Sequence, residues 1–171
     1  MPIRRRDCPG ERTLLPVRIA RSAISESIPH RDLYLSPGHG LFIDGFLMPA
    51  KDLVNQSSIA SSMPSDLERI EYYQIVLATH QIIWAEGAPV ETFVGLSKAA
   101  YEAFDNFDEF ERLYPDDAHV MTPLARNLGS GRAHLSALIG VGVGYFSEVP
   151  DPLQAAYARI AVRAGQYGLS P

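Results

Sequence analysis

The sequence LFIDGFLM at residues 41–48 restricts the fold more than any other stretch of the chain. Asp44 and Gly45 separate two short apolar runs, and an Asp-Gly pair accepts the two positive φ angles of a tight type I′ turn. This pattern predicts a β-hairpin. From residue 17 to about residue 93, similar short runs are interrupted by Pro, Gly, Asp and Ser at short intervals, which is typical of an antiparallel all-β domain.

Three further stretches of this region predict strands. Residues 17–19 and 33–35 are short runs of alternating apolar residues. Residues 70–84 are rich in β-branched and aromatic residues but are interrupted by Ala-Thr-His, so they predict two strands or one bent strand. Glu86 and Gly87 then predict a turn that leads into another short run at residues 90–93.

The second half of the chain changes to helical spacing. Apolar residues recur every three or four positions in residues 98–104 and 108–114, with acidic residues between them. The last predicted helix is capped by Asp151, has Pro152 at its first position and is expected to stop at Gly165. Five residues form the apolar stripe by which this helix is expected to pack: Leu153, Ala156, Tyr157, Ile160 and Ala164.

Charge and cysteine content exclude several classes of function. The chain of 171 residues has 15 Lys and Arg against 20 Asp and Glu, a formal net charge of −5. A nucleic-acid surface needs a positive excess, so no nucleic-acid partner is expected. Cys8 is the single cysteine, which excludes an internal disulfide framework and a multi-cysteine zinc site.

Hydropathy gives no indication of membrane association. The longest weakly polar stretch, residues 135–146, is shorter than the roughly 20 residues of a membrane-spanning helix and contains three glycines. The N-terminal residues before Pro16 are charged and have no continuous apolar region of the kind a secretory signal contains. We therefore expect a soluble protein without a membrane partner.

Ser36, His39 and His80 are the candidate catalytic residues. Both histidines are expected at turns in the β region, and an imidazole that titrates near pH 7 can accept or donate a proton in a reaction. The Ser36 hydroxyl could orient a neighbouring peptide. Taken alone, two histidines in this setting more often have a structural role at strand ends than a catalytic one. The glycines of residues 129–144 predict turns, because no strand precedes them and no phosphate-loop Lys-Ser/Thr follows.

The texts RDLYLSPGHGLFIDGFLMPAKDLVN and YYQIVLATHQIIWAEGAPVETF resemble the later part of bacterial hedgehog/intein (Hint) domains. In that family a Ser/Thr-x-x-His motif activates the peptide at an N-terminal Cys or Ser and promotes its shift from an amide to a thioester or ester. Ser36 and His39 match this motif. A second His assists later steps in inteins, and His80, followed by Ala85 and Gly87, matches the pattern His-x-x-x-x-Ala-x-Gly.

The resemblance implies a mainly β fold: a partial Hint-type β horseshoe over residues 1–95 with a C-terminal α-helical extension over residues 96–171. The chain also departs from the family pattern at several positions. Inteins carry an Asp and a cyclising Asn at positions that hold Tyr73 and Thr92 here, so full splicing is not expected. Only 35 residues precede Ser36, and Cys8 lacks the expected opening of a nucleophile strand.

These features predict a protein of the autocatalytic protein-processing lineage that is inactive in this form because the N-terminal nucleophile is absent. The alternative is a protein-interaction module, completed by a companion polypeptide that carries the missing N-terminal Hint strands. A stand-alone hydrolase is a third hypothesis. No cofactor is expected, and a zinc site of histidines with acidic residues lacks ligand spacing; its candidates are His30, His39, His80, Asp32 and Asp44.

Overall fold

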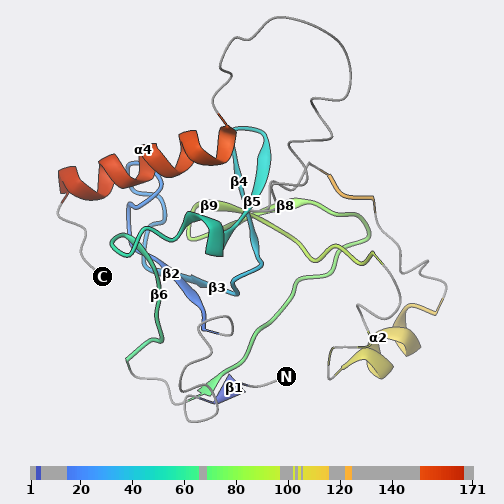
Figure 1. Ribbon diagram of the computed structural model, residues 1–171. Helices are drawn as coiled ribbons and strands as arrows, with labels where there is room; N and C mark the ends of the chain where they lie inside the picture. Colours follow the sequence, from blue (N-terminus) through green and yellow to red (C-terminus); the bar gives the residue numbers. More distant parts are fainter. Residues whose placement is uncertain are drawn as a thin grey trace, which may run out of the picture.

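The computed structural model describes residues 3–4, 15–65, 69–96, 102, 104, 106–115, 122–124 and 151–167. The fold is mainly β with a C-terminal α-helix, as predicted, and all of its described strand pairs are antiparallel (Figure 1). Cys8, His119, His134 and the glycines of residues 129–144 lie outside the described residues. Among the described residues, no helix has the length and apolar character needed to cross a membrane.

The strands form three sheets. A three-stranded sheet has the order β3-β2-β6, with bounds Leu33–Leu35, Val17–Ile19 and Ile59–Ser61. A four-stranded sheet has the order β5-β4-β9-β8, with bounds Phe46–Pro49, Gly40–Ile43, Ala88–Glu91 and Ile82–Ala85. The strands β1 (Ile3–Arg4) and β7 (Arg69–Ile70) form a separate pair. The described helical segments are η2 (Ala50–Leu53), which follows β5, α2 (Phe107–Leu113), which follows β9, and the C-terminal helix α4 (Pro152–Tyr167).

The hairpin between β4 and β5 forms where the sequence predicted it. Asp44 and Gly45 have φ angles of 52° and 88°, which are the positive angles of a type I′ turn. Ile43 pairs with Phe46 and Leu41 with Met48, so the register follows directly from the two-residue turn.

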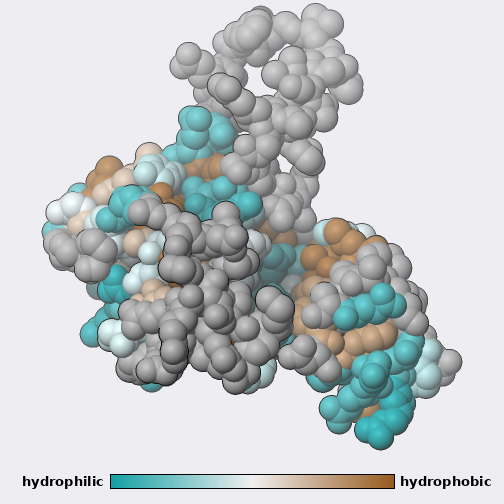
Figure 2. All heavy atoms as spheres, turned by 60° about the horizontal axis from the view of Figure 1, so that its bottom comes forward, coloured by the Kyte–Doolittle hydropathy of each residue, from teal (hydrophilic) through white to brown (hydrophobic). Residues whose placement is uncertain are grey.

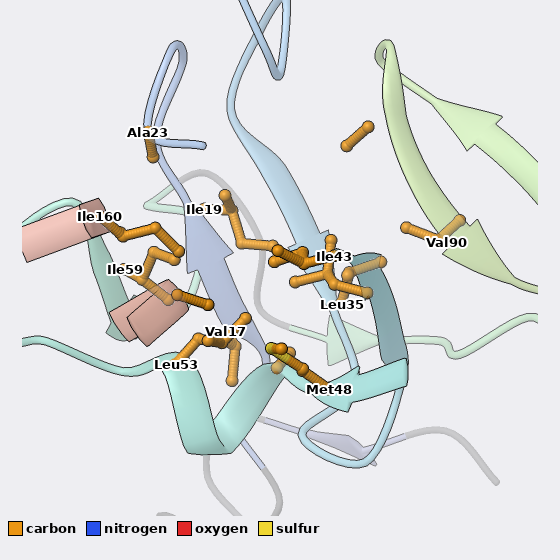
Figure 3. Close-up of a cluster of buried hydrophobic side chains, with 14 of the residues drawn as sticks. Val17, Ile19, Ala23, Leu35, Ile43, Met48, Leu53, Ile59, Val90 and Ile160 are labelled. Carbon is orange, nitrogen blue, oxygen red and sulfur yellow. The ribbon is translucent and has the colours of Figure 1, made fainter. Parts of the chain in front are cut away.

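The hydrophobic core collects side chains from both larger sheets and from α4 (Figure 3). Val17 and Ile19 of β2 are completely buried, while Arg18 between them is not, which is the period-two alternation of a strand with one buried face. Leu53 of η2 and Ile160 of α4 reach the same cluster. The C-terminal helix therefore shares a core with strands that lie more than 60 residues earlier in the chain.

The helix α4 has the predicted N-terminus and a different C-terminus. Asp151 Oδ1 accepts a hydrogen bond from Leu153 N at 3.0 Å, and Pro152 is the first helical residue. The helix continues through Gly165 to Tyr167, because Gly165 does not adopt the positive φ angle of a C-terminal cap. Of the predicted stripe, Tyr157 is 39% exposed and is not part of the packed face; Ala156, Ile160 and Ala164 are buried and Leu153 is partly buried.

The secondary structure of two segments differs from the prediction or lies partly outside the described residues. Within residues 70–84, β7 ends at Ile70 and β8 begins at Ile82, so the aromatic stretch between them is not a strand. Main-chain bonds join it to the chain after β9, from Phe93 N to Ile75 O at 2.9 Å and from Thr92 N to Gln81 O at 2.8 Å, but residues 71–81 belong to no described strand. The predicted helix over 108–114 is α2, shifted by one residue; the one over 98–104 lies mostly outside the described residues.

Candidate functional site

His39 lies at the end of a tight turn that leads into β4. Ser36 O accepts the His39 N–H at 3.0 Å, which closes a four-residue turn. Two further main-chain bonds fix this turn against η2, because His39 O accepts from Ala50 N at 2.9 Å and Pro37 O from Lys51 N at 3.0 Å. The turn therefore has a fixed position relative to the core.

Glu91, the last residue of β9, brings its carboxylate to the first residue of β4. Gly40 N donates to Glu91 Oε1 at 2.6 Å, a short bond to a charged acceptor. A Cβ atom at position 40 would lie 2.6 Å from that oxygen and 2.8 Å from the carboxyl carbon, distances that real Cβ atoms do not show. Only glycine at position 40 accepts the carboxylate in this place.

His80 lies two residues before the start of β8 and is only 3% exposed. Its Nδ1 accepts a hydrogen bond from Leu124 N at 3.0 Å, and its Nε2 is 3.3 Å from Glu91 Oε2. The chain on either side is held by Thr92, since Thr92 N donates to Gln81 O at 2.8 Å and Thr92 Oγ1 accepts from Gln81 N at 3.0 Å. His80 is therefore fixed at the open end of the β8–β9 hairpin.

The surroundings of His39 favour its neutral form. Burial lowers the pKa of the imidazole below its ordinary value of 6.5, and the negative charge and main chain of Glu91 only partly oppose this effect. His39 Nε2 is shielded from solvent and has no hydrogen-bond partner. His80 Nε2 also lacks a regular hydrogen bond: it is close enough to Glu91 for an electrostatic attraction, but the alignment of the two groups is poor.

Two of the three predicted catalytic residues thus lie near the same residue: His80 approaches the carboxylate of Glu91, and His39 interacts with its main chain and its charge. His39 and His80 both lie beside Glu91, whereas Ser36 contributes its carbonyl to the turn before His39. Their catalytic roles stay a prediction. Thr92, at the position of the intein Asn, serves as a main-chain brace, and Tyr73 is 81% exposed and donates its hydroxyl hydrogen to Glu71.

Sequence reasoning missed Glu91. A signal for it exists: Val90 and Thr92 are apolar or small and buried, so the strand alternation turns the intervening carboxylate to the opposite side of the strand. That alternation does not show which residues lie on that side. The contact with Gly40 joins residues 51 positions apart and depends on the pairing of Leu41 with Val90.

Three residues of the zinc hypothesis, His30, Asp32 and Asp44, have other neighbours than His39 and His80. His30 is exposed and faces the backbone of Gly87, where a Cβ would meet its ring at 2.8 Å. Asp32 is bound to Arg18 and Asp44 to Arg159, each at 2.7 Å. Within the described part of the chain, no group of three metal-ligating side chains is suitably placed for a metal ion.

A hollow in the surface lies apart from His39 and His80. It has a volume of about 150 Å³ and lies between the extended segment after β7 and α2. Figure 2 shows apolar and polar side chains close together on the face of the molecule that it presents. Five aromatic residues line the hollow: Tyr72, Tyr73, Phe104, Phe107 and Phe110. It contains no acid–base pair, so the candidate chemistry stays with the buried cluster around Glu91.

The family model of the Hint domain matches residues 2–96 of the chain. The chain belongs to the Hint domain family. The matched stretch contains Ser36, His39, His80 and Glu91, so the whole cluster is part of the Hint domain. No curated protein and no solved structure matches the chain significantly.

Proposed function

We propose that this Hint-domain chain contributes the acid–base centre of an autoprocessing reaction, and that the chain is inactive until a Cys or Ser nucleophile reaches that centre. The position of His39 and His80 on either side of one residue, Glu91, supports this proposal most directly: His80 Nε2 is 3.3 Å from its carboxylate, and His39 interacts with its main chain and its charge. A buried cluster of two imidazoles and one carboxylate is suited to moving protons between two reacting groups.

The reaction would be an acyl shift. The sulfur or oxygen of the nucleophile attacks the carbonyl carbon of the preceding peptide, a new C–S or C–O bond forms, and the C–N bond breaks. The proton lost by the nucleophile ends on the leaving amine. Ser36 and His39 would activate the amide and His80 would assist its breakdown. Because burial lowers the pKa of His39, this ring is neutral near pH 7 and can accept a proton.

A second candidate function is a protein-interaction module, and the edge of the four-stranded sheet favours it. Among the described residues, β8 pairs only with β9, and Trp84 on β8 is 72% exposed. An open strand edge with exposed apolar side chains can add a strand from another polypeptide. A companion that carries N-terminal Hint strands would suit this edge and could also supply the nucleophile.

Intact-mass spectrometry tests the autoprocessing proposal. The chain alone should keep its mass with and without dithiothreitol. A version extended in frame by the upstream genomic sequence should split before a cysteine or serine, faster with dithiothreitol if the intermediate is a thioester. His39→Ala should abolish the split, and His30→Ala, a matched change at an exposed histidine, should not.

Two outcomes would contradict the proposal: an extended chain whose mass never changes, or a His39→Ala variant that splits at the unmodified rate. Co-purification of a companion polypeptide, with cleavage only in the mixture, would support the interaction module together with processing in trans. A companion that binds without any cleavage would leave only the interaction module.

A further inference from the structure

We propose that Glu91 is a positioning residue that holds His80 protonated at Nε2, so that Nδ1 is the nitrogen that accepts the proton in the reaction. This inference rests on the proposed function, because it assigns the working atom of the same site. It also makes a statement about the resting protein, the tautomer of His80, that can be measured without any cleavage.

The two nitrogens of His80 have partners of opposite kinds. Leu124 N is a donor, so Nδ1, 3.0 Å away, must present a lone pair to it. In a neutral imidazole the proton then resides on Nε2. That nitrogen is 3.3 Å from Glu91 Oε2, without the alignment of a regular hydrogen bond, and the negative charge of the carboxylate favours an N–H over a lone pair there. Both contacts therefore select the same tautomer.

The carboxylate is itself held in place from the opposite side. Its second oxygen, Oε1, accepts the Gly40 N–H at 2.6 Å, and the absence of a side chain at position 40 makes room for it. Glu91 thus connects the start of β4 to the ring before β8. It cannot turn away from His80 without giving up a short, charge-assisted bond.

The main-chain N–H of Leu124 marks the place of a reacting donor. During breakdown of the amide, which Ser36 and His39 have activated, a nucleophile in that place would pass its S–H or O–H proton to His80 Nδ1. The resulting imidazolium would carry a proton on both nitrogens, with the Nε2 proton facing Glu91, and would return the Nδ1 proton to the leaving amine. A carboxylate beside Nε2 stabilises the positive ring during this interval. The donor must first displace residues 122–124 from the ring.

His39 is the other titratable group beside Glu91, so a test must distinguish the two rings. Long-range ¹H–¹⁵N correlation spectra of the protein with labelled histidine report which ring nitrogen carries the proton. The signals of His80 are assigned by their loss in His80→Asn. We expect Nε2 of His80 to be protonated and Nδ1 to be an acceptor in the unmodified chain.

The variant Glu91→Gln tests the cause of that tautomer. The glutamine oxygen can still accept from Gly40 N–H, but its NH₂ group then faces Nε2 and favours a lone pair there. We expect the fraction of His80 protonated at Nε2 to fall several-fold. Glu26→Gln makes the same chemical change at an exposed turn residue and should leave the spectrum unchanged.

Gly40→Ala provides a second test in case Glu91→Gln does not fold. It retains the carboxylate charge but adds a methyl group 2.6 Å from Glu91 Oε1, so it should shift the tautomer in the same direction. Protonation of His80 at Nδ1 in the unmodified chain would overturn the inference. Unchanged His80 signals in either folded variant would also overturn it.

Cleavage of the upstream-extended chain separates this inference from the proposed function. Glu91→Gln should slow cleavage by about 100-fold, the lower end of what a well-placed acid–base group contributes. If the unmodified extended chain never cleaves, the proposed function fails. The NMR measurement of the His80 tautomer then still tests the role of Glu91. If the chain cleaves and Glu91→Gln cleaves equally fast, the inference fails and the proposed function stands.

Discussion

The α-helices α2 and α4 show that similar sequence patterns can contribute very differently to the hydrophobic core. Both were predicted from apolar residues at three- and four-residue spacing. The helix α4 buries Ala156, Ile160 and Ala164, and the first two join the core formed by the sheets. The helix α2 has seven residues, none of them buried, and lies on the opposite side of the molecule (Figure 1). A surface of the right shape, more than the pattern itself, decides how much a helix stabilises the fold.

The contacts of the two helices with the rest of the chain differ in the same way. Arg163 of α4 donates to Ser22 O at 2.6 Å, and Arg159 pairs with Asp44 at the tip of the β4–β5 hairpin. The region of α2 is joined to the chain after β9 by an edge-to-face contact between Phe93 and Phe104, with ring centroids 5.1 Å apart. We therefore expect α4 to unfold with the core and α2 to contribute little to that transition.

The largest expected effect is that of Ile160→Ala. Because Ile160 is 2% exposed within the core, its truncation should lower the free energy of unfolding by about 2–5 kcal/mol. Phe110→Ala, on α2, should cost less than about 1 kcal/mol because that helix has no buried residue. Urea unfolding followed by the fluorescence of Trp84, the single tryptophan, measures both. Equal losses would show that α2 is as much a part of the cooperative unit as α4.

A smaller effect is expected at the start of α4. Asp151→Ala removes the side chain that accepts from Leu153 N, and should lower the free energy of unfolding by about 1 kcal/mol. Asp151→Asn keeps an acceptor and should recover most of this loss. If the urea midpoint does not move in Asp151→Ala, the end of α4 is not coupled to the core.

The smallest effect concerns His39, whose turn is bonded to η2. Burial lowers the pKa of His39 below 6.5, so the unfolded chain binds more protons than the folded chain as the pH falls through this range. The contribution of this residue to stability is therefore complete above about pH 6.5 and is lost as the pH falls from there toward the lowered value. Urea midpoints at about pH 7.5 and pH 5.5 measure this loss.

His39→Gln should flatten that pH dependence, because glutamine does not titrate. His30→Gln is the matched control, since His30 is exposed and lies away from Glu91. A pH dependence that persists in His39→Gln and disappears in His30→Gln would show that the buried cluster is not the source.

Much of the fold could be predicted because its signals are local. The Asp44–Gly45 turn needs only two residues that accept positive φ angles, and the start of α4 needs only Asp151 followed by Pro152. The stretch after β7 was predicted less well. Its β-branched and aromatic residues favour a strand, but a strand requires a partner strand, and the described strand pairs include none of residues 71–81.

The candidate site likewise has a part that local sequence signals determine and a part that they do not. The sequence by itself determined that His39 and His80 stand at turns in a β domain, because the residues around each of them indicate those turns. Only the tertiary structure decided that both rings meet at Glu91. That meeting depends on the pairing of β4 with β9, which brings Gly40 within 2.6 Å of a carboxylate 51 residues away. No local pattern encodes such a contact, because its geometry exists only once the sheet has formed and the core has fixed the positions of its strands.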